Sequence, residues 1–162
     1  MLYAYEFPSI TGPIRITAND THITGIMWIE REKTAADTEL AFQKTPLIAQ
    51  AEIELNEYFA GKRTAFSVPL SPQGTPFQKR VWDALCAIPY GETRSYAQIA
   101  AAVGSPKGFR AVGGANHHNP IVIMIPCHRV IGADGSLTGF GGGLPVKELL
   151  LHLEREHAGK GA

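Results

Sequence analysis

The stretch 121-IVIMIPCHRVI-131 decides how the second half of the chain folds. It is apolar and rich in β-branched residues, and only Pro126-Cys127-His128-Arg129 interrupt it. A short apolar run of this kind predicts a buried strand. A thiol, an imidazole and a guanidinium therefore stand where we expect the protein interior, and this segment is the first candidate for a functional site.

The residues after this run predict a helix that carries a buried charge. The glycine-rich segment 139-GFGGG-143 leads into a helix begun by Pro145. At about 100° per residue, Leu150 and Leu151 flank a narrow sector of that helix that holds Lys147 and Glu154. Since an unpaired buried charge is costly, Glu154 should have a partner. We expect Lys147 to pair with Glu154 or with a backbone carbonyl.

The residues before the run predict a helix-turn-helix. Apolar residues between Phe77 and Ile88 recur along one helical face. A second helix opens at Ser95 with Gln98 as a capping box and stops at Gly104. Pro106 begins a third helix that continues to about His117, and two short helices joined by a tight glycine turn are typical of this motif. Gly113 and Gly114 inside the third helix cost about 1 kcal/mol each, which suggests a close neighbour, either a packed helix or a DNA backbone.

The first part of the chain has a different character. Strands are predicted at Leu2–Phe7, Ile14–Ala18 and His22–Ile29, followed by a helix at Pro46–Phe59. The proline-rich segment 67-SVPLSPQGTP-76 is the best linker in the chain. We therefore expect an α+β protein with two domains: a small N-terminal α/β domain over 1–70, and a mostly helical domain over 71–162 that carries the site.

Composition limits the class of protein. The net charge is zero, but residues 1–74 are net −3 and residues 75–162 net +3, a basic sign that a phosphate backbone attracts. There is no membrane-length apolar run and no secretory signal, so we expect a cytoplasmic protein, or a nuclear one in a eukaryote. The two cysteines, Cys86 and Cys127, make neither a disulfide framework nor a zinc signature. Cys86 is interpreted as a small buried side chain.

Five segments resemble one known family, the O6-alkylguanine-DNA alkyltransferases. They are 74-GTPFQKRVW-82, 88-IPYGETRSYAQIA-100, 109-FRAVGGANHHNP-120, 125-IPCHRVIGADG-135 and 141-GGGLPVKELLLHLE-154. The resemblance implies a ribonuclease H-like N-terminal domain and a winged helix-turn-helix-like second domain. It also implies DNA repair by direct reversal, in which the alkyl group of O6-alkylguanine, and of O4-alkylthymine, passes irreversibly to the protein's own cysteine.

The resemblance assigns roles residue by residue. Cys127 is the alkyl acceptor, His128 the base that acts through a water, and Glu154 the carboxylate that orients the imidazole. Asn119 is a hinge, and Tyr96 contacts guanine N3 and donates a proton to the leaving base. Arg110 holds the flipped nucleotide out of the stack. The further substrate and DNA contacts are the carbonyls of Cys127 and Val130, the N–H of Gly141, Lys147 as support, and Ala111 and Gly113 on the recognition helix.

The resemblance also implies the partner: double-stranded DNA, approached from the minor groove, with the O6-alkylguanine flipped into a pocket. We expect no metal, no cofactor and no membrane. A monomer is expected, and the sequence leaves open whether it binds DNA cooperatively. Of the six histidines, only His128 is given a role.

The transfer of an alkyl group to a protein side chain is best served by a thiol. Dealkylation at an sp³ carbon needs a soft nucleophile, and the product thioether has no carbonyl for water to attack, so each protein acts once. A thiol with a pKa near 8.5 is only about 7% ionised at pH about 7.4, so ionisation adds at most about fourteenfold. Neighbouring side chains of a strand point to opposite faces, so a bridging water is expected between Cys127 and His128.

Three other functions fit parts of the sequence. A helix-turn-helix regulator explains the basic half but has no use for a buried Cys-His-Glu set. A cysteine hydrolase uses that set, but it turns over repeatedly on an ester or an amide. A damage-binding relative of the alkyltransferases recognises the same lesion without chemistry, but such proteins lack the acceptor cysteine.

Overall fold

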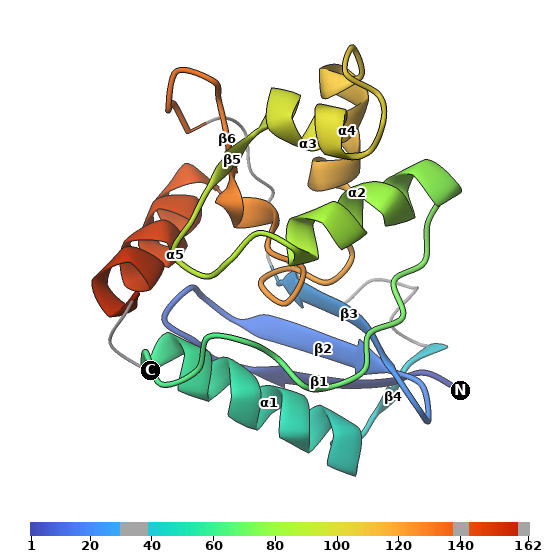
Figure 1. Cartoon of the computed structure of the whole chain (residues 1–162). Helices are drawn as coiled ribbons and strands as arrows, with labels where there is room; N and C mark the ends of the chain where they lie inside the picture. The colour runs from blue at the N-terminus through green and yellow to red at the C-terminus, as the bar shows by residue number, and fades with distance from the viewer. Residues whose placement is uncertain (30–38, 138–142, 159–162) are drawn as a thin grey trace. The chain divides into compact units, whose positions relative to one another are not determined.

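The computed structural model describes residues 1–29, 39–137 and 143–158. The chain divides into two compact units, Met1–Pro72 and Gln73–Ala162, and each is described by itself (Figure 1). Strands dominate the first unit and helices the second, so the protein is α+β as predicted. None of the helices in the described ranges is long and apolar enough to cross a membrane.

The first unit is a four-stranded sheet with one helix. Its strands are β1 (Tyr3–Phe7), β2 (Ile14–Ala18), β3 (Ile23–Trp28) and β4 (Ala41–Phe42), in the order β3-β2-β1-β4. β1, β2 and β3 pair antiparallel, whereas β4 pairs parallel to β1. The three predicted strands and the helix α1 (Pro46–Phe59) are confirmed, while the two-residue β4 was not predicted.

Alternation along the strands explains how this unit buries its core. In β2, Ile14, Ile16 and Ala18 are fully buried, while the residues between them are partly exposed, the period-two pattern of a strand with one covered face. α1 contacts β2 and β3 and contributes Leu55 and Tyr58 to the core. Thr45 caps α1, because its hydroxyl accepts from the Ile48 N–H.

The second unit is mostly helical. It contains α2 (Pro76–Cys86), β5 (Arg94–Ser95), α3 (Tyr96–Ala102), α4 (Phe109–His117), a 3₁₀ helix (Cys127–Arg129), β6 (Val130–Ile131) and α5 (Leu144–His157). α4 packs against α2 and α3, and α5 contacts the 3₁₀ helix. β5 and β6 pair in parallel, which ties the start of α3 to the residues that follow Arg129. This pairing brings the beginning of α3 and the Cys127 segment to one place.

The helix-turn-helix is present, with one boundary corrected. The capping box at Ser95 and Gln98 is formed by both expected hydrogen bonds, and α3 ends before Gly104, whose φ is 79°. The following helix was predicted to begin at Pro106, which is wrong: α4 begins at Phe109. Residues 105–108 instead form a turn closed by the Gly108 N–H donating to the Ser105 carbonyl.

The predicted strand over 121–131 is also wrong. Within this stretch only Val130–Ile131 is a strand, and residues 121–126 wind into tight turns that are buried except at Val122. The N–H groups of Met124 and Cys127 donate to carbonyls two residues earlier, those of Val122 and Ile125. Ile123 has a φ of 73°, a region that β-branched residues rarely adopt, so the backbone here is strained.

Asn119 replaces the sheet partner that a strand would need. Its side-chain amide donates to the Ile125 carbonyl at 2.8 Å, and its oxygen accepts from the Ile121 N–H at 3.0 Å. Two buried backbone groups are therefore paired with one asparagine side chain, and local turn hydrogen bonds pair others, in place of a ladder. A sequence with strand-like composition can thus form a compact turn that presents Cys127 at its end.

Candidate active site

Cys127 lies in the interior of the second unit. It begins the 3₁₀ helix, and its side chain is only 3% exposed. Burial raises the pKa of the thiol to about 11, although Asn119 and the positive charge of Lys147 act in the opposite direction. Only about 0.03% of such a thiol is ionised at pH 7.4, against about 7% for an ordinary one. The fourteenfold limit calculated for an unperturbed thiol therefore does not apply to Cys127, because burial leaves much less of this thiol ionised.

His128 and Glu154 form a buried pair beside the thiol. His128 Nε2 lies 2.6 Å from Glu154 Oε2, with both side chains almost completely buried. An imidazole that donates from Nε2 to a carboxylate carries its lone pair on Nδ1 when it is neutral. Burial lowers the pKa of His128 and outweighs the opposing hydrogen bond and charge of Glu154, so the ring is neutral at physiological pH. The pair can accept a proton through Nδ1.

Arg129 holds the other side of the same carboxylate. Its Nε donates to Glu154 Oε1 at 2.8 Å, its Nη2 donates to Oε2 at 3.0 Å, and its Nη1 donates to the Ile88 carbonyl at 2.7 Å. The backbone N–H of Gly91 adds a further hydrogen bond to Oε1. Burial opposes ionisation of Glu154, but His128 and Arg129 outweigh it and lower the pKa of the carboxyl to about 2. Glu154 therefore has the partner that its predicted burial required.

Two basic residues of the site, Arg129 and Lys147, are buried and paired within the protein. Arg129 is only 6% exposed and is bonded to Glu154, so it is not available to cover a phosphate. Lys147, also buried, donates from Nζ to the Val130 carbonyl at 2.6 Å, the second of its two predicted partners. Burial lowers the pKa of Lys147, and Cys127 acts in the opposite direction. Lys147 thus fixes the chain just beyond the 3₁₀ helix.

Tyr96 lies where β5 meets α3. It is partly buried, and a Cβ built on Gly113 would come within 4.0 Å of its ring. The Tyr96 side chain therefore faces α4, and an alanine at Gly113 would make an ordinary contact. Neither Gly113 nor Gly114 is required by close packing among the described residues, since a Cβ at Gly114 meets nothing within 4 Å. Of the two neighbours predicted for these glycines, this disfavours the packed helix.

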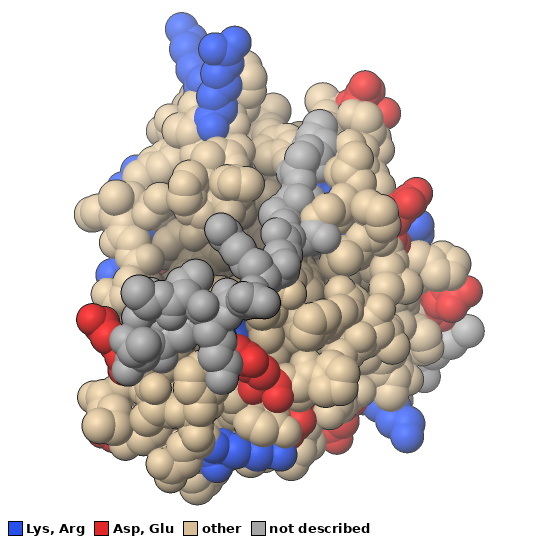
Figure 2. Space-filling view, turned by 180° about the vertical axis from the view of Figure 1, so that it is seen from behind, with Lys and Arg blue, Asp and Glu red and all other residues tan. Residues whose placement is uncertain are grey.

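The outer face of α4 is exposed and combines small side chains with basic ones. Arg110, Ala111, Gly114, His117 and His118 are exposed and fall on one face of the helix. In Figure 2, basic side chains project from the helical unit at the end where α3 and α4 lie in Figure 1. Such a face suits a polyanion that approaches closely.

The remaining predicted residues are partly accounted for. Val130 is buried and Asn119 is nearly so, while Gly141 lies outside the described residues. Cys86 was expected to be buried, which is wrong, because it is exposed near the end of α2. Sequence reasoning missed Gly91 and also Asn116, which is 5% exposed on α4 and donates to the Cys127 carbonyl at 3.3 Å. The sequence did contain a signal, because Asn116 is a polar residue on the same helix face as Val112 and Ala115.

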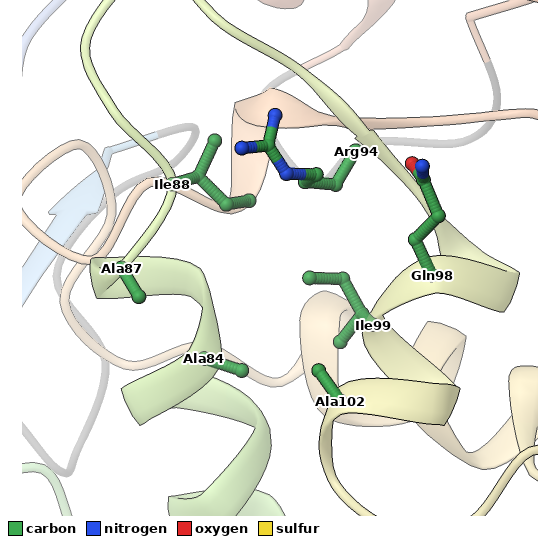
Figure 3. Close-up of a pocket in the computed structure, with 7 residues that line it drawn as sticks. All are labelled: Ala84, Ala87, Ile88, Arg94, Gln98, Ile99 and Ala102. Atoms are coloured by element: carbon green, nitrogen blue, oxygen red, sulfur yellow. The ribbon is translucent and has the colours of Figure 1, made fainter.

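A separate cavity of about 410 Å³ lies between α2 and α3. Figure 3 shows the Arg94 side chain extending across it toward Ile88, with small side chains on the opposite side. None of the predicted site residues lines it; the lining residues are Ala84, Ala87, Ile88, Arg94, Gln98, Ile99 and Ala102. The described residues also contain no group of three or more His, Cys, Asp or Glu side chains that could hold a metal ion.

Comparison with known proteins decides the family. Residues 76–156 match the DNA binding domain of 6-O-methylguanine DNA methyltransferase, and residues 1–72 match its ribonuclease-like domain. The chain belongs to the O6-methylguanine-DNA methyltransferase family. The matched ranges contain every residue of the Cys127, His128, Arg129 and Glu154 cluster.

Individual members of this methyltransferase family are similar in sequence to this chain over nearly its whole length. The constitutive methylated-DNA–protein-cysteine methyltransferase of Bacillus subtilis is 50% identical over 150 residues, covering 89% of this chain and 90% of that protein. A relative from Methanosarcina barkeri is 46% identical over 96% of this chain and 99% of its own length. The structure of Mycobacterium tuberculosis OGT in complex with DNA has a TM-score of 0.88 and 46% identity, covering 96% and 94% of the two chains.

Proposed function

We propose that this protein repairs alkylated DNA by transferring the alkyl group of O6-alkylguanine to Cys127, where it stays. The observation that carries the proposal is the buried Cys127 thiol at the start of a 3₁₀ helix whose next residue, His128, is bonded to the buried Glu154. Family membership over both units supports it, and so does the relative whose structure contains DNA. The reaction is a single transfer rather than a cycle.

The first step is removal of the thiol proton. With a pKa of about 11, the resting Cys127 is protonated, and ionising it at pH 7.4 costs about 5 kcal/mol. We assign the proton to His128 Nδ1, which carries the lone pair, and propose that it passes through a bridging water. Glu154 stabilises the resulting imidazolium through its hydrogen bond to Nε2. Arg129 and Gly91 keep the carboxylate in place for this role.

The second step is substitution at the alkyl carbon. The Cys127 sulfur forms a bond to that carbon as the bond from carbon to O6 breaks, and the electron pair passes to the purine. Tyr96 donates a proton to guanine N3, so that the base leaves neutral. The products are S-alkylcysteine and guanine, and the thioether offers no electrophile for water, so the thiol is not regenerated.

The DNA partner is bound through α4. We propose that α4 enters the minor groove of double-stranded DNA, that Arg110 occupies the position of the flipped nucleotide, and that Ala111 and Gly113 allow close approach of the helix. Asn119 joins α4 to the Cys127 segment through its two hydrogen bonds. The protein acts as a monomer, and O4-alkylthymine is a second substrate. Phosphate contacts make its affinity fall with salt.

A stoichiometric titration tests this function. Increasing amounts of a duplex containing O6-methylguanine are added to the protein, and the restored guanine is counted. Repair should stop at one lesion per chain, and Cys127→Ala should repair none while still binding the duplex. Repair that continues through many lesions per chain would instead indicate a hydrolytic or catalytic mechanism.

A further inference from the structure

Asn116 is a buried amide with one half of its hydrogen-bonding capacity used. Its Nδ2 donates to the Cys127 carbonyl at 3.3 Å, and among the described residues no donor lies within hydrogen-bonding reach of its buried Oδ1. The orientation of the amide is fixed by chemistry, because the opposite one would set two acceptors against each other. A buried acceptor without a donor costs about 1–3 kcal/mol, so Oδ1 is expected to receive a hydrogen bond from a bound molecule.

The place of Asn116 is rigid and close to the reactive residue. The preceding carbonyl, that of Ala115, accepts from Trp82 Nε1 at 2.8 Å, which holds α4 at this point. The two polar atoms of an amide lie about 2.3 Å apart, so Oδ1 is at most about 5.6 Å from the Cys127 carbonyl oxygen. An amino group donates with its two N–H bonds to acceptors about 5 Å apart. The two oxygens can therefore bind one amino group between them.

The substrate offers one such group. In O6-alkylguanine the alkyl group removes the proton from N1, and N9 is bonded to the sugar, so the 2-amino group carries the base's only N–H donors. In O4-alkylthymine, N3 has lost its proton in the same way and no N–H donor remains. An acceptor in the base pocket is thus satisfied by a guanine lesion and left unpaired by a thymine lesion.

We propose that Asn116 Oδ1 accepts a hydrogen bond from the 2-amino group of the flipped O6-alkylguanine and gives the site its preference for guanine lesions over thymine lesions. This rests on the proposed alkyl transfer to Cys127. The two carbonyls assigned to the amino group each already receive one hydrogen bond, that of Cys127 from Asn116 Nδ2 and that of Val130 from Lys147. Asn116 Oδ1 receives none from the described residues, so both of its lone pairs are available to the same amino group.

The test compares single-turnover rates on three duplexes that carry O6-methylguanine, O6-methylhypoxanthine, which lacks only the 2-amino group, and O4-methylthymine. The wild-type protein should react faster with O6-methylguanine than with O6-methylhypoxanthine. In Asn116→Leu this ratio should fall about fivefold, the factor expected for one neutral hydrogen bond. In the control Val112→Ala, which alters the same buried side of α4 but removes no hydrogen-bonding group, the ratio should not change.

A ratio that is the same in Asn116→Leu and in the wild type would overturn the proposal, because a purely structural residue slows all three reactions alike. If Asn116→Leu does not fold, Asn116→Ser serves in the same comparison. A crystal structure of Cys127→Ala bound to the O6-methylguanine duplex is independent of both variants. It should place N2 within about 3.2 Å of Asn116 Oδ1, and a separation well beyond that would refute the contact. Absence of any transfer by the wild-type protein would instead refute the proposed function.

Discussion

Gly114→Ala distinguishes the effect of this residue on the stability of α4 from its effect on DNA binding. The glycine is exposed in the middle of the helix, and a Cβ added there meets no atom within 4 Å in the described structure. Alanine is better than glycine in a helix interior by about 1 kcal/mol, and nothing in the structure offsets that gain. The variant should therefore be more stable by about 1 kcal/mol, which corresponds to a rise in Tm of about 2–4 °C for a protein of this size.

The same methyl group should weaken DNA binding. Gly114 lies on the open face of α4 with Arg110 and Ala111, the face that we propose enters the minor groove. A methyl group inserted into a close contact costs about 1–3 kcal/mol, so the affinity for duplex DNA should fall about fivefold or more. A glycine that lowers helix stability is then explained by the partner rather than by the fold.

Two measurements on the same variant check this reasoning. Thermal unfolding followed by circular dichroism gives the stability, and fluorescence anisotropy with a labelled duplex at fixed salt gives the affinity. Higher stability with unchanged affinity would refute the placement of this face against DNA. Lower stability would refute the open space around Gly114.

Three further outcomes follow from the site. Arg129→Met should lower the free energy of unfolding by about 3–5 kcal/mol, measured by urea denaturation, because it leaves the Glu154 carboxylate buried without its cation; a loss below 1 kcal/mol would contradict the pairing. Arg110→Ala should slow repair of duplex DNA more than repair of single-stranded DNA, since extrusion of a base costs a few kcal/mol; equal rates on duplex with and without Arg110 would contradict the assignment. The transfer rate should stay constant as pH falls through 6.5, because burial lowers the pKa of His128. The rate should also show no step near pH 8.5, because the pKa of Cys127 is about 11. A loss of rate centred at or above pH 6.5 would contradict a neutral buried base.

The regular helices and strands of the fold could be predicted from the sequence. α1 and β2 have the predicted bounds, and the Ser95 capping box opens α3 as expected. These elements follow from periodicity and from local capping, which depend on residues close in sequence. The predicted burial and pairing of Glu154 also followed from helical geometry alone.

The structure of the Cys127 segment could not be predicted in the same way. Its composition favours a strand, but the turns over residues 121–126 depend on hydrogen bonds from Asn119 and on a strained Ile123. A propensity cannot show that a side chain substitutes for a neighbouring strand. The rule that adjacent side chains diverge therefore does not apply to Cys127 and His128, because a 3₁₀ helix holds them.

The role of Arg129 shows the same limit. A single basic residue next to a histidine can face phosphate or a carboxylate, and the sequence favours neither. The choice is made by α5, which brings Glu154 beside the 3₁₀ helix, and by the Ile88 carbonyl. The raised pKa of Cys127 is likewise a consequence of enclosure by distant segments, so it could not be read from the residues around the thiol.

The most direct test of the central claim is the mass of the peptide that contains Cys127 after incubation with a duplex carrying O6-methylguanine. We expect an increase of about 14 Da, one methyl group, on that peptide alone and in no more than one copy per chain. The exposed thiol of Cys86 serves as an internal control and should remain unmodified. Methylation of Cys86 instead of Cys127, or restored guanine with no added mass on either cysteine, would show that Cys127 is not the alkyl acceptor.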